Sequence, residues 1–174
     1  MKIYVMRHGT TNWNEKGIVQ GRSQNRLSEE GKKLAEQSAE KYKNKQIDVI
    51  FTSPLMRTMQ TTNFMNKYHN CKIIKDDRLI EIDQGIFTGR KKADLTEEEL
   101  KLKNLKSKAC KMENYDEVFE RVSKFLNYLK KTSFENVLIV THNCITLNIE
   151  HILTGKKILD IKNYANAEVR EFVV

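Results

Sequence analysis

Two histidines and two arginines lie at or just beyond the ends of apolar segments that have the length of β-strands. Arg7 and His8 end the first segment, Arg57 follows the second, and His142 comes directly after a third. A guanidinium group can donate two parallel hydrogen bonds to a phosphate, and a neutral imidazole nitrogen is a competent nucleophile. If the fold brings these side chains together, they form a pocket for a tetrahedral dianion, and the chemistry they predict is phosphoryl transfer.

The charge that develops on a transferring phosphoryl group must be met by fixed positive donors. The two arginines and the second histidine would supply them, so we expect neither a metal ion nor a cofactor. The cysteines agree with this expectation, because Cys71, Cys110 and Cys144 are odd in number, widely spaced and without a CxxC pair. They suggest neither a zinc site nor a disulfide framework.

The segments that must position these residues alternate between strand and helix patterns. Strands are predicted at 2–7, 47–52, 72–75, 136–141 and 168–174. Helices are predicted at 28–45, from Pro54 to about 68, around 94–108, at 115–129 and after 142. This alternation predicts a three-layer α/β/α sandwich with a mainly parallel sheet, in which ligands bind at the carboxyl ends of the strands.

Three helical details are more specific. The proline of Ser53-Pro54 is expected at an early position of the helix that follows, where its fixed backbone angle is favourable. Val118, Phe119, Val122, Leu126 and Leu129 fall at the spacing of one buried helix face. The dense basic stretch 101–111 follows three glutamates, and its simplest interpretation is a solvated helix face.

The composition predicts one domain over residues 1–174 in the cytoplasm. The chain has 39% hydrophobic residues, a single proline and seven glycines, with no repeat or linker-like tract. No apolar run approaches the ~20 residues of a membrane span. The net charge of +8 fits nucleic acid, an anionic membrane or small phosphorylated substrates. We expect small phosphorylated substrates as partners, and neither nucleic acid nor a membrane.

The segment Arg7–Asn14 reads RHGTTNWN, and related motifs continue along the chain at Leu27–Gly31, Thr52–Thr61, Leu79–Glu81 and Val140–His142. These motifs resemble those of the histidine phosphatase superfamily, which includes the cofactor-dependent phosphoglycerate mutases. The resemblance spans nearly the whole chain and implies a phosphoglycerate mutase-like fold. It also implies a short cap insertion around residues 83–114.

Residue by residue, the resemblance implies that His8 is the phosphorylated nucleophile and that Arg7, Arg57 and His142 clamp the phosphoryl group. Glu81 becomes the proton donor to the leaving oxygen. The remaining substrate-binding residues are expected to be Asn14, Gly21 and Asn143. Glu81 also makes chemical sense by itself, because a carboxyl group in an apolar site can stay protonated near neutral pH. Asp83 is its nearest rival for that role.

Asn143-Cys144 follows the second histidine where the family usually has glycine, so the close backbone approach at that corner is expected to differ. Two further features separate this sequence from a typical mutase. Thr10 stands where mutases commonly carry an acidic residue. His142 comes only 61 positions after Glu81, which leaves little room for a large cap. A mutase must keep water from its phosphoenzyme, whereas a phosphatase must admit it. The short cap therefore favours hydrolysis of a phosphate monoester.

Other interpretations remain open at this point. The chain could be a phosphoglycerate mutase or a non-catalytic phosphate-binding protein, and its charge alone could suggest a nucleic-acid-binding module. Cys144 could be a nucleophile or, more simply, a packing residue. Arg90, Lys91 and Lys92 could meet a second anionic group or belong to an exposed loop. Sugar phosphates, phosphoglycerates and α-ribazole phosphate are all possible substrates, and the oligomeric state is undetermined.

Overall fold

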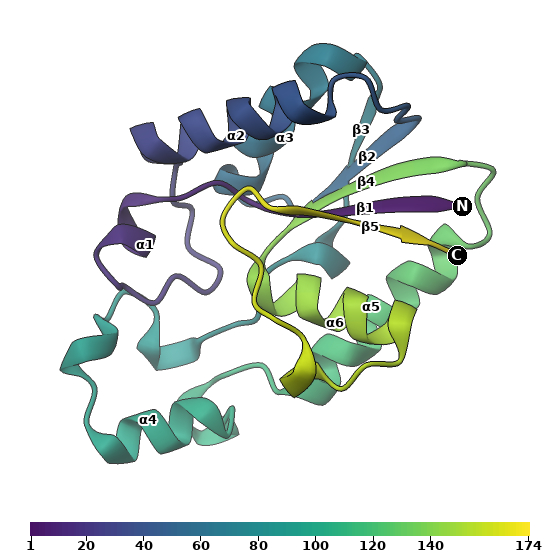
Figure 1. Cartoon of the computed structure of the whole chain (residues 1–174). Coiled ribbons are helices and arrows are strands. Elements are labelled where there is room, and N and C mark those ends of the chain that lie inside the picture. Colours follow the sequence, from purple (N-terminus) through teal and green to yellow (C-terminus); the bar gives the residue numbers. More distant parts are fainter.

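A five-stranded sheet forms the centre of the computed structural model, which describes residues 1–174 (Figure 1). The strands are arranged in the order β3-β2-β4-β1-β5. Four are parallel to one another, and β5 pairs antiparallel with β1. Their bounds are β1 (Lys2–Arg7), β2 (Val49–Thr52), β3 (Lys72–Lys75), β4 (Asn136–Thr141) and β5 (Val169–Val173). Because Arg7 pairs with Thr141 and Thr52 with Val140, three carboxyl ends lie at one level.

Helices cover both faces of this sheet, so the predicted three-layer sandwich is confirmed. Figure 1 shows α2 (Glu29–Tyr42) and α3 (Met56–His69) on one face, and α5 (Tyr115–Leu129) and α6 (Asn143–Thr154) on the other. Strand alternation explains the arrangement, since successive side chains point to opposite faces. In β1, Tyr4 and Met6 pack in the core on the α2/α3 side, whereas Ile3 and Val5 pack in the core under α5 and α6.

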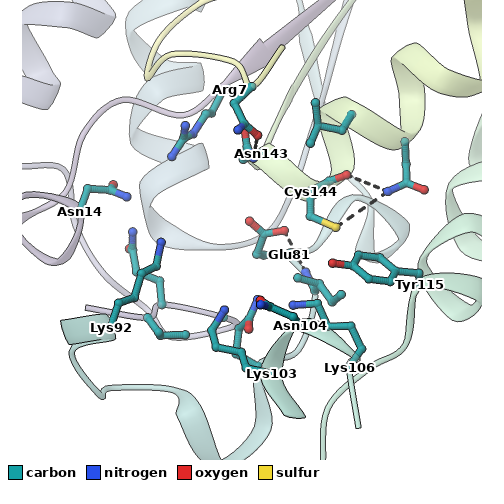
Figure 2. A pocket seen from close by; sticks show the side chains of 18 of the residues that line it. Arg7, Asn14, Glu81, Lys92, Lys103, Asn104, Lys106, Tyr115, Asn143 and Cys144 are labelled. Atoms are coloured by element: carbon teal, nitrogen blue, oxygen red, sulfur yellow. Dashed lines mark hydrogen bonds between the residues drawn. The ribbon is translucent and has the colours of Figure 1, made fainter. Parts of the chain in front are cut away.

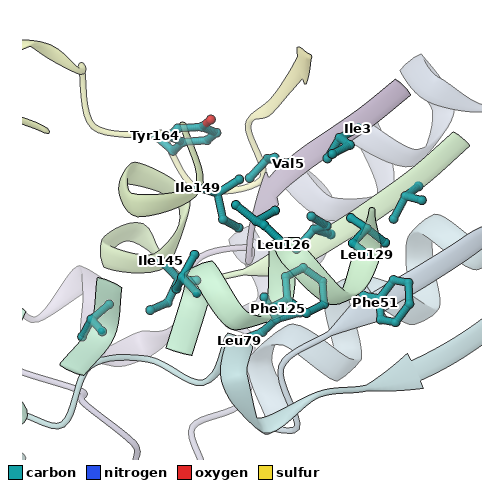
Figure 3. Packing of buried hydrophobic residues seen from close by; sticks show 14 of the residues in the cluster. Ile3, Val5, Phe51, Leu79, Phe125, Leu126, Leu129, Ile145, Ile149 and Tyr164 are labelled. Atoms are coloured by element: carbon teal, nitrogen blue, oxygen red, sulfur yellow. The ribbon is translucent and has the colours of Figure 1, made fainter. Parts of the chain in front are cut away.

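The larger core lies between the sheet and the helices α5 and α6 (Figure 3). Phe51 from β2 meets Phe125 from α5 edge to face, with 5.4 Å between ring centroids. Leu79, on the connection that leads toward Glu81, is fully buried in the same cluster. Packing of this density fixes the backbone, so the core holds the residues at the strand ends in place.

A separate, smaller cluster supports the segment that was predicted as a cap. This segment contains short 3₁₀ turns and α4 (Glu97–Asn104), and it lies beyond the carboxyl ends of the strands, near α1 (Asn12–Glu15) (Figure 1). Its apolar side chains pack around the loop after α1. The cluster consists of Val19 from that loop and Phe87, Leu95, Cys110 and Met112 from the segment. The segment is thereby attached to the same end of the sheet as the predicted site.

The structure corrects several predicted boundaries. The second strand begins at Val49 rather than at residue 47, and the charged helix is shortened to α4, which starts at a capping box between Thr96 and Glu99. Pro54 lies before α3 rather than in its first turn, because Leu55 is the N-cap and Met56 the first helical residue. The loop after the first strand contains the single helical turn α1.

One predicted core residue is wrong, and the membrane prediction can be compared with the helices. Phe119 is 43% exposed and lies beside the His151 ring, while Phe125 takes the buried position on α5. No helix has both the length and the apolar character needed to cross a membrane.

Candidate active site

A cavity of about 790 Å³ opens at the carboxyl ends of the strands, between the sheet and the segment that contains α4 (Figure 2). Most of the predicted site residues line it. They are Arg7, His8, Asn14, Gly21, Arg57, Glu81 and Asn143. His142 does not line the cavity but packs against His8, with 5.2 Å between the ring centroids. The fold thus brings together residues from four separate parts of the chain.

The His8 ring is held in one tautomer at the end of β1. Its Nδ1 lies 2.7 Å from the carbonyl oxygen of Gly9. A carbonyl can only accept, so Nδ1 carries the proton and Nε2 keeps its lone pair. Burial lowers the pKa of His8 well below 6.5, and the positive charge of Arg57 lowers it further. The ring is therefore a neutral imidazole with Nε2 available as a nucleophile.

The loop after His8 is fixed by two glycines in close contact. A Cβ on Gly9 would lie 2.5 Å from the carbonyl oxygen of Gly31, and a Cβ on Gly31 would lie 1.9 Å from that of Thr10. Only glycine permits this approach of loop and helix α2. The Gly9 N–H also donates to the hydroxyl of Thr61 on α3, at 3.0 Å. His8 is consequently positioned by two helices as well as by its strand.

Arg57, in the first turn of α3, is buried and fixed by three hydrogen bonds. Its guanidinium donates to the carbonyls of Gly21 and Ser23 at 2.8 and 2.7 Å, and its Nε–H donates to Nδ1 of His142 at 3.2 Å. Burial lowers the pKa of Arg57 to about 10, so it stays charged at neutral pH. Guanidinium has five N–H donors, which leaves two for an anion in the cavity.

His142 is fixed by the same contacts. Because its Nδ1 accepts from Arg57, its Nε2 carries the proton and donates to the Ser53 hydroxyl at 2.8 Å. Burial is the main reason that its pKa lies well below 6.5, and the charge of Arg57 adds to it. His142 thus contacts Arg57 and His8, which line the cavity, and does not line it itself.

Arg7 offers a donor that the protein does not use. One of its terminal nitrogens donates to the Tyr164 carbonyl at 2.6 Å, whereas its buried Nε–H has no partner. A buried donor without a partner is costly, and an anion in the cavity would satisfy it. Burial lowers the pKa of Arg7, and the nearby carboxyl of Glu81 acts in the opposite direction.

Asn14 presents its amide to the same space (Figure 2). Its side-chain oxygen accepts from both the backbone N–H and the hydroxyl of Thr11, at 3.1 and 3.0 Å. The first of these bonds belongs to the capping box of α1, and both fix which end of the amide faces inward. The NH₂ group is left free to donate to an anion.

Glu81 lies at the centre of the cavity wall in Figure 2. Its Oε1 accepts from the backbone N–H of Ile82 at 3.0 Å. Desolvation raises the pKa of this carboxyl, although the Ile82 N–H and the charges of Arg57 and Arg7 act against the rise. A raised pKa favours the protonated form, which a general acid requires. Asp83, its rival in the sequence, does not line the cavity and instead accepts from the N–H of Gly85.

A polar network holds the backbone of Glu81. Arg22 donates from Nε to the Glu81 carbonyl at 3.2 Å and pairs with the Glu113 carboxylate at 3.1 Å. Glu113 also accepts two bonds from Arg121 on α5, at 2.8 and 3.0 Å. Sequence reasoning did not identify this network, because its members are far apart in the chain and follow no recognisable motif.

The start of α6 contributes Asn143 and Cys144. Asn143 donates to the side-chain oxygen of Asn163 at 2.8 Å, while its own side-chain oxygen is buried without a partner. Cys144 lines the cavity, but burial raises the pKa of its thiol to about 12. A thiol in this state is not a nucleophile at neutral pH, which supports its interpretation as a packing residue.

The basic residues of the cap behave differently from what the sequence suggested. Lys106 is only 7% exposed, so the prediction of a solvated helix face is wrong there. Lys92, Lys103 and Lys106 line the cavity, together with Asn104 and Tyr115. Arg90 instead donates two bonds to Glu99, and Lys91 is exposed. Their pattern in the sequence could not reveal this, since the burial depends on how the cap folds over the cavity. No group of three or more histidine, cysteine, aspartate or glutamate side chains is arranged to hold a metal ion.

Comparison with known proteins places these observations in context. A family model described as the histidine phosphatase superfamily, branch 1, matches residues 3–173. Phosphoserine phosphatase 1 of Hydrogenobacter thermophilus is 32% identical over 149 residues, covering 82% of this chain and 71% of that protein. A probable phosphoglycerate mutase, GpmB, of Cronobacter sakazakii is 39% identical over 99 residues, which are 57% of this chain and 46% of that protein.

Among solved structures, the α-ribazole phosphatase from Shigella flexneri has a similar fold, with a TM-score of 0.88. The match covers 98% of this chain and 89% of that one at 20% sequence identity. At this identity the likeness concerns the fold alone.

Proposed function

We propose that this chain, which belongs to the histidine phosphatase superfamily and is a phosphatase, hydrolyses a small phosphate monoester through a phosphohistidine at His8. One observation carries the proposal. The bond from Nδ1 of His8 to the Gly9 carbonyl leaves Nε2 free in a cavity that also holds an unpartnered arginine donor and a carboxyl of raised pKa. These are the groups that a phosphoryl transfer without a metal needs.

In the first half-reaction, Nε2 of His8 attacks phosphorus in line with the leaving oxygen. The bond from nitrogen to phosphorus forms as the bond from phosphorus to the ester oxygen breaks. Arg7, Arg57 and the amide of Asn14 would donate to the equatorial oxygens, where charge accumulates. Glu81 gives its proton to the departing alkoxide, which leaves as an alcohol.

In the second half-reaction, the Glu81 carboxylate takes a proton from a water molecule as that water attacks the phosphohistidine. Inorganic phosphate is released, His8 returns to its neutral form, and Glu81 is again protonated. The same carboxyl therefore serves as acid and then as base, as microscopic reversibility requires for two successive transfers at one phosphorus.

Phosphoglycerate mutase is the weaker alternative. The phosphoserine phosphatase relative matches 82% of the chain, whereas the mutase relative matches 57%. A mutase must also hold its phosphoenzyme away from water while the substrate reorients. We further propose that residues 1–174 form one domain in which residues 83–114 are a short cap, and that it acts in the cytoplasm on small phosphorylated compounds rather than on nucleic acid or membranes.

The direct test is hydrolysis of p-nitrophenyl phosphate in the presence of EDTA by the wild type, by His8→Ala and by His69→Ala. His69 is a matched control because it lies at the end of α3, outside the cavity. We expect the wild type and H69A to be equally active and H8A to be inactive. Equal activity in all three proteins would remove His8 as the nucleophile. Phosphate binding without turnover by the wild type would favour a non-catalytic phosphate-binding protein.

A further inference from the structure

Three lysines face the cavity from the cap, on the wall opposite Arg7 and Asn143 (Figure 2). Lys92 lies in a 3₁₀ turn, Lys103 lies in the last turn of α4, and Lys106 is the second residue after α4. None of the three forms an ion pair or a side-chain hydrogen bond with the protein. The mechanism proposed above uses none of them, so their charge is unexplained by the phosphoryl site.

Two neighbouring cations in the same segment are paired with carboxylates, which distinguishes them from the three lysines that face the cavity. Arg90 pairs with Glu99, and Lys108 pairs with Glu117. Both of these pairs lie outside the cavity lining. The cap therefore has carboxylate partners for two of its outward-facing cations and leaves Lys91, Lys101 and Lys111 exposed to water, but it provides no carboxylate for the three lysines that face inward.

Two of the inward-facing lysines, Lys103 and Lys106, are also partly removed from water, whereas Lys92 is exposed. Lys106 is 7% exposed, and its ammonium lies 5.5 Å from the centre of the Tyr115 ring. Burial lowers the pKa of Lys103 to about 8, with further contributions from Lys106 and Lys92. Repulsion between the buried ammonium of Lys106 and the neighbouring ammonium groups of Lys103 and Lys92 is unfavourable unless an anion joins them. Glu81 is the carboxyl that acts on Lys106, and the proposed reaction needs it in its protonated form before attack.

We propose that these lysines form a second anion site and that the substrate is a phosphate monoester carrying a second, dianionic group, such as another phosphoryl group. This inference rests on the proposed function, because it takes the Arg7 and Arg57 side of the cavity as the site of the phosphoryl group that is cleaved. Three ammonium groups exceed what one carboxylate would neutralise, and they match a phosphate dianion more closely. The Asn104 amide, on the same wall, adds a neutral hydrogen-bonding group.

The test uses ligands that cannot be hydrolysed, so that it does not depend on catalysis. Isothermal titration at pH 7 would compare α,ω-alkylbisphosphonates of two to six methylene groups with alkylphosphonates and ω-carboxyalkylphosphonates of the same lengths. The proteins are the wild type, the double variant K103Q/K106Q and Lys101→Gln. Lys101 is the matched control because it lies on α4 but is exposed and does not line the cavity.

We expect the best bisphosphonate to bind the wild type and K101Q at least tenfold more tightly than the alkylphosphonate of equal length. In K103Q/K106Q this ratio should fall by at least fivefold. A ratio near one at every length in the wild type would overturn the proposal, and so would an unchanged ratio in the double variant. An equal gain from the carboxyalkylphosphonates would overturn the dianionic assignment. A lysine-dependent gain in a protein that does not hydrolyse p-nitrophenyl phosphate would reject the proposed catalysis but keep the second site.

Discussion

Replacing Glu81 with glutamine should slow the reaction by an amount that depends on the leaving group. The substitution keeps the size of the side chain and its contact with the Ile82 N–H, but it removes the proton that the carboxyl would donate. General acid catalysis contributes roughly 10²–10⁴-fold to rate, or about 3–5 kcal/mol of transition-state free energy. For an alkyl ester such as glycerol 2-phosphate, whose alkoxide leaves poorly, we expect the whole loss in kcat/KM.

For p-nitrophenyl phosphate the loss in the first half-reaction should be much smaller, because the phenolate is a stable anion that needs little protonation. The assay is kcat/KM for both esters with the wild type, E81Q and Asp83→Asn. Asp83 is the control because it is two residues away and outside the cavity lining. An equal loss for both esters in E81Q would refute the role of Glu81 as the acid, and a larger loss in D83N would assign that role to its rival.

The same residue predicts the shape of the pH profile. Glu81 must be protonated to act, so kcat/KM for an alkyl ester should fall as the pH rises through the pKa of this group. Because desolvation raises that pKa above 4.5, the fall should come at a higher pH than for an ordinary glutamate. His8 must be neutral, and its pKa lies well below 6.5, so its protonation should limit the rate only in acid. In E81Q the alkaline fall assigned to Glu81 should disappear.

Further predictions concern binding, reactivity and stability. Arg57→Lys should lower kcat/KM for p-nitrophenyl phosphate roughly 10²–10³-fold, because lysine cannot reproduce the forked contacts of the guanidinium with the Gly21 and Ser23 carbonyls. The control Arg90→Lys, outside the cavity, should keep the wild-type value. Cys144, with a thiol pKa of about 12, should resist iodoacetamide at pH 8 in the folded protein, as peptide mapping would show; rapid alkylation there would contradict its packing role. Gly31→Ala should lower the free energy of unfolding in urea titrations by about 3 kcal/mol, because its Cβ would meet the Thr10 carbonyl. Gly17→Ala, in open space at φ +65°, should lower it by only about 1 kcal/mol. Equal losses would refute the steric argument. The ratio of bisphosphonate affinity to monophosphonate affinity should fall from pH 7 to pH 9, because Lys103, beside Lys92 and Lys106, loses its proton near pH 8. An unchanged ratio would contradict this titration.

The strands and the histidine motifs could be predicted because their causes are local. Val137 to Val140 form a continuous apolar run, which is typical of a strand covered on both faces, and β4 occupies the predicted range. Arg7, His8 and His142 follow from the rule that polar residues at the ends of parallel strands share one edge of the sheet. These inferences need no knowledge of how distant loops pack.

The loops around the cavity could not be predicted in the same way. The position of Arg57 depends on carbonyls at Gly21 and Ser23, in a loop whose pattern indicates no regular structure. Lys106 adopts φ +50°, a conformation that its type does not favour, and its burial results from the packing of the cap. Charged residues in a helical pattern are ordinarily solvated, so tertiary contacts overrode the local signal here.

The central claim is that His8 carries the phosphoryl group during turnover, and rapid-quench labelling tests it most directly. With ³²P-labelled p-nitrophenyl phosphate, departure of the stable phenolate should be fast, so the phosphoenzyme should accumulate before water attacks it. Quenching in base preserves a phosphohistidine, and peptide mapping locates it. We predict label on His8 in the wild type, none in H8A, and loss of the label in acid. Label on another residue, or continued turnover by H8A, would contradict the account.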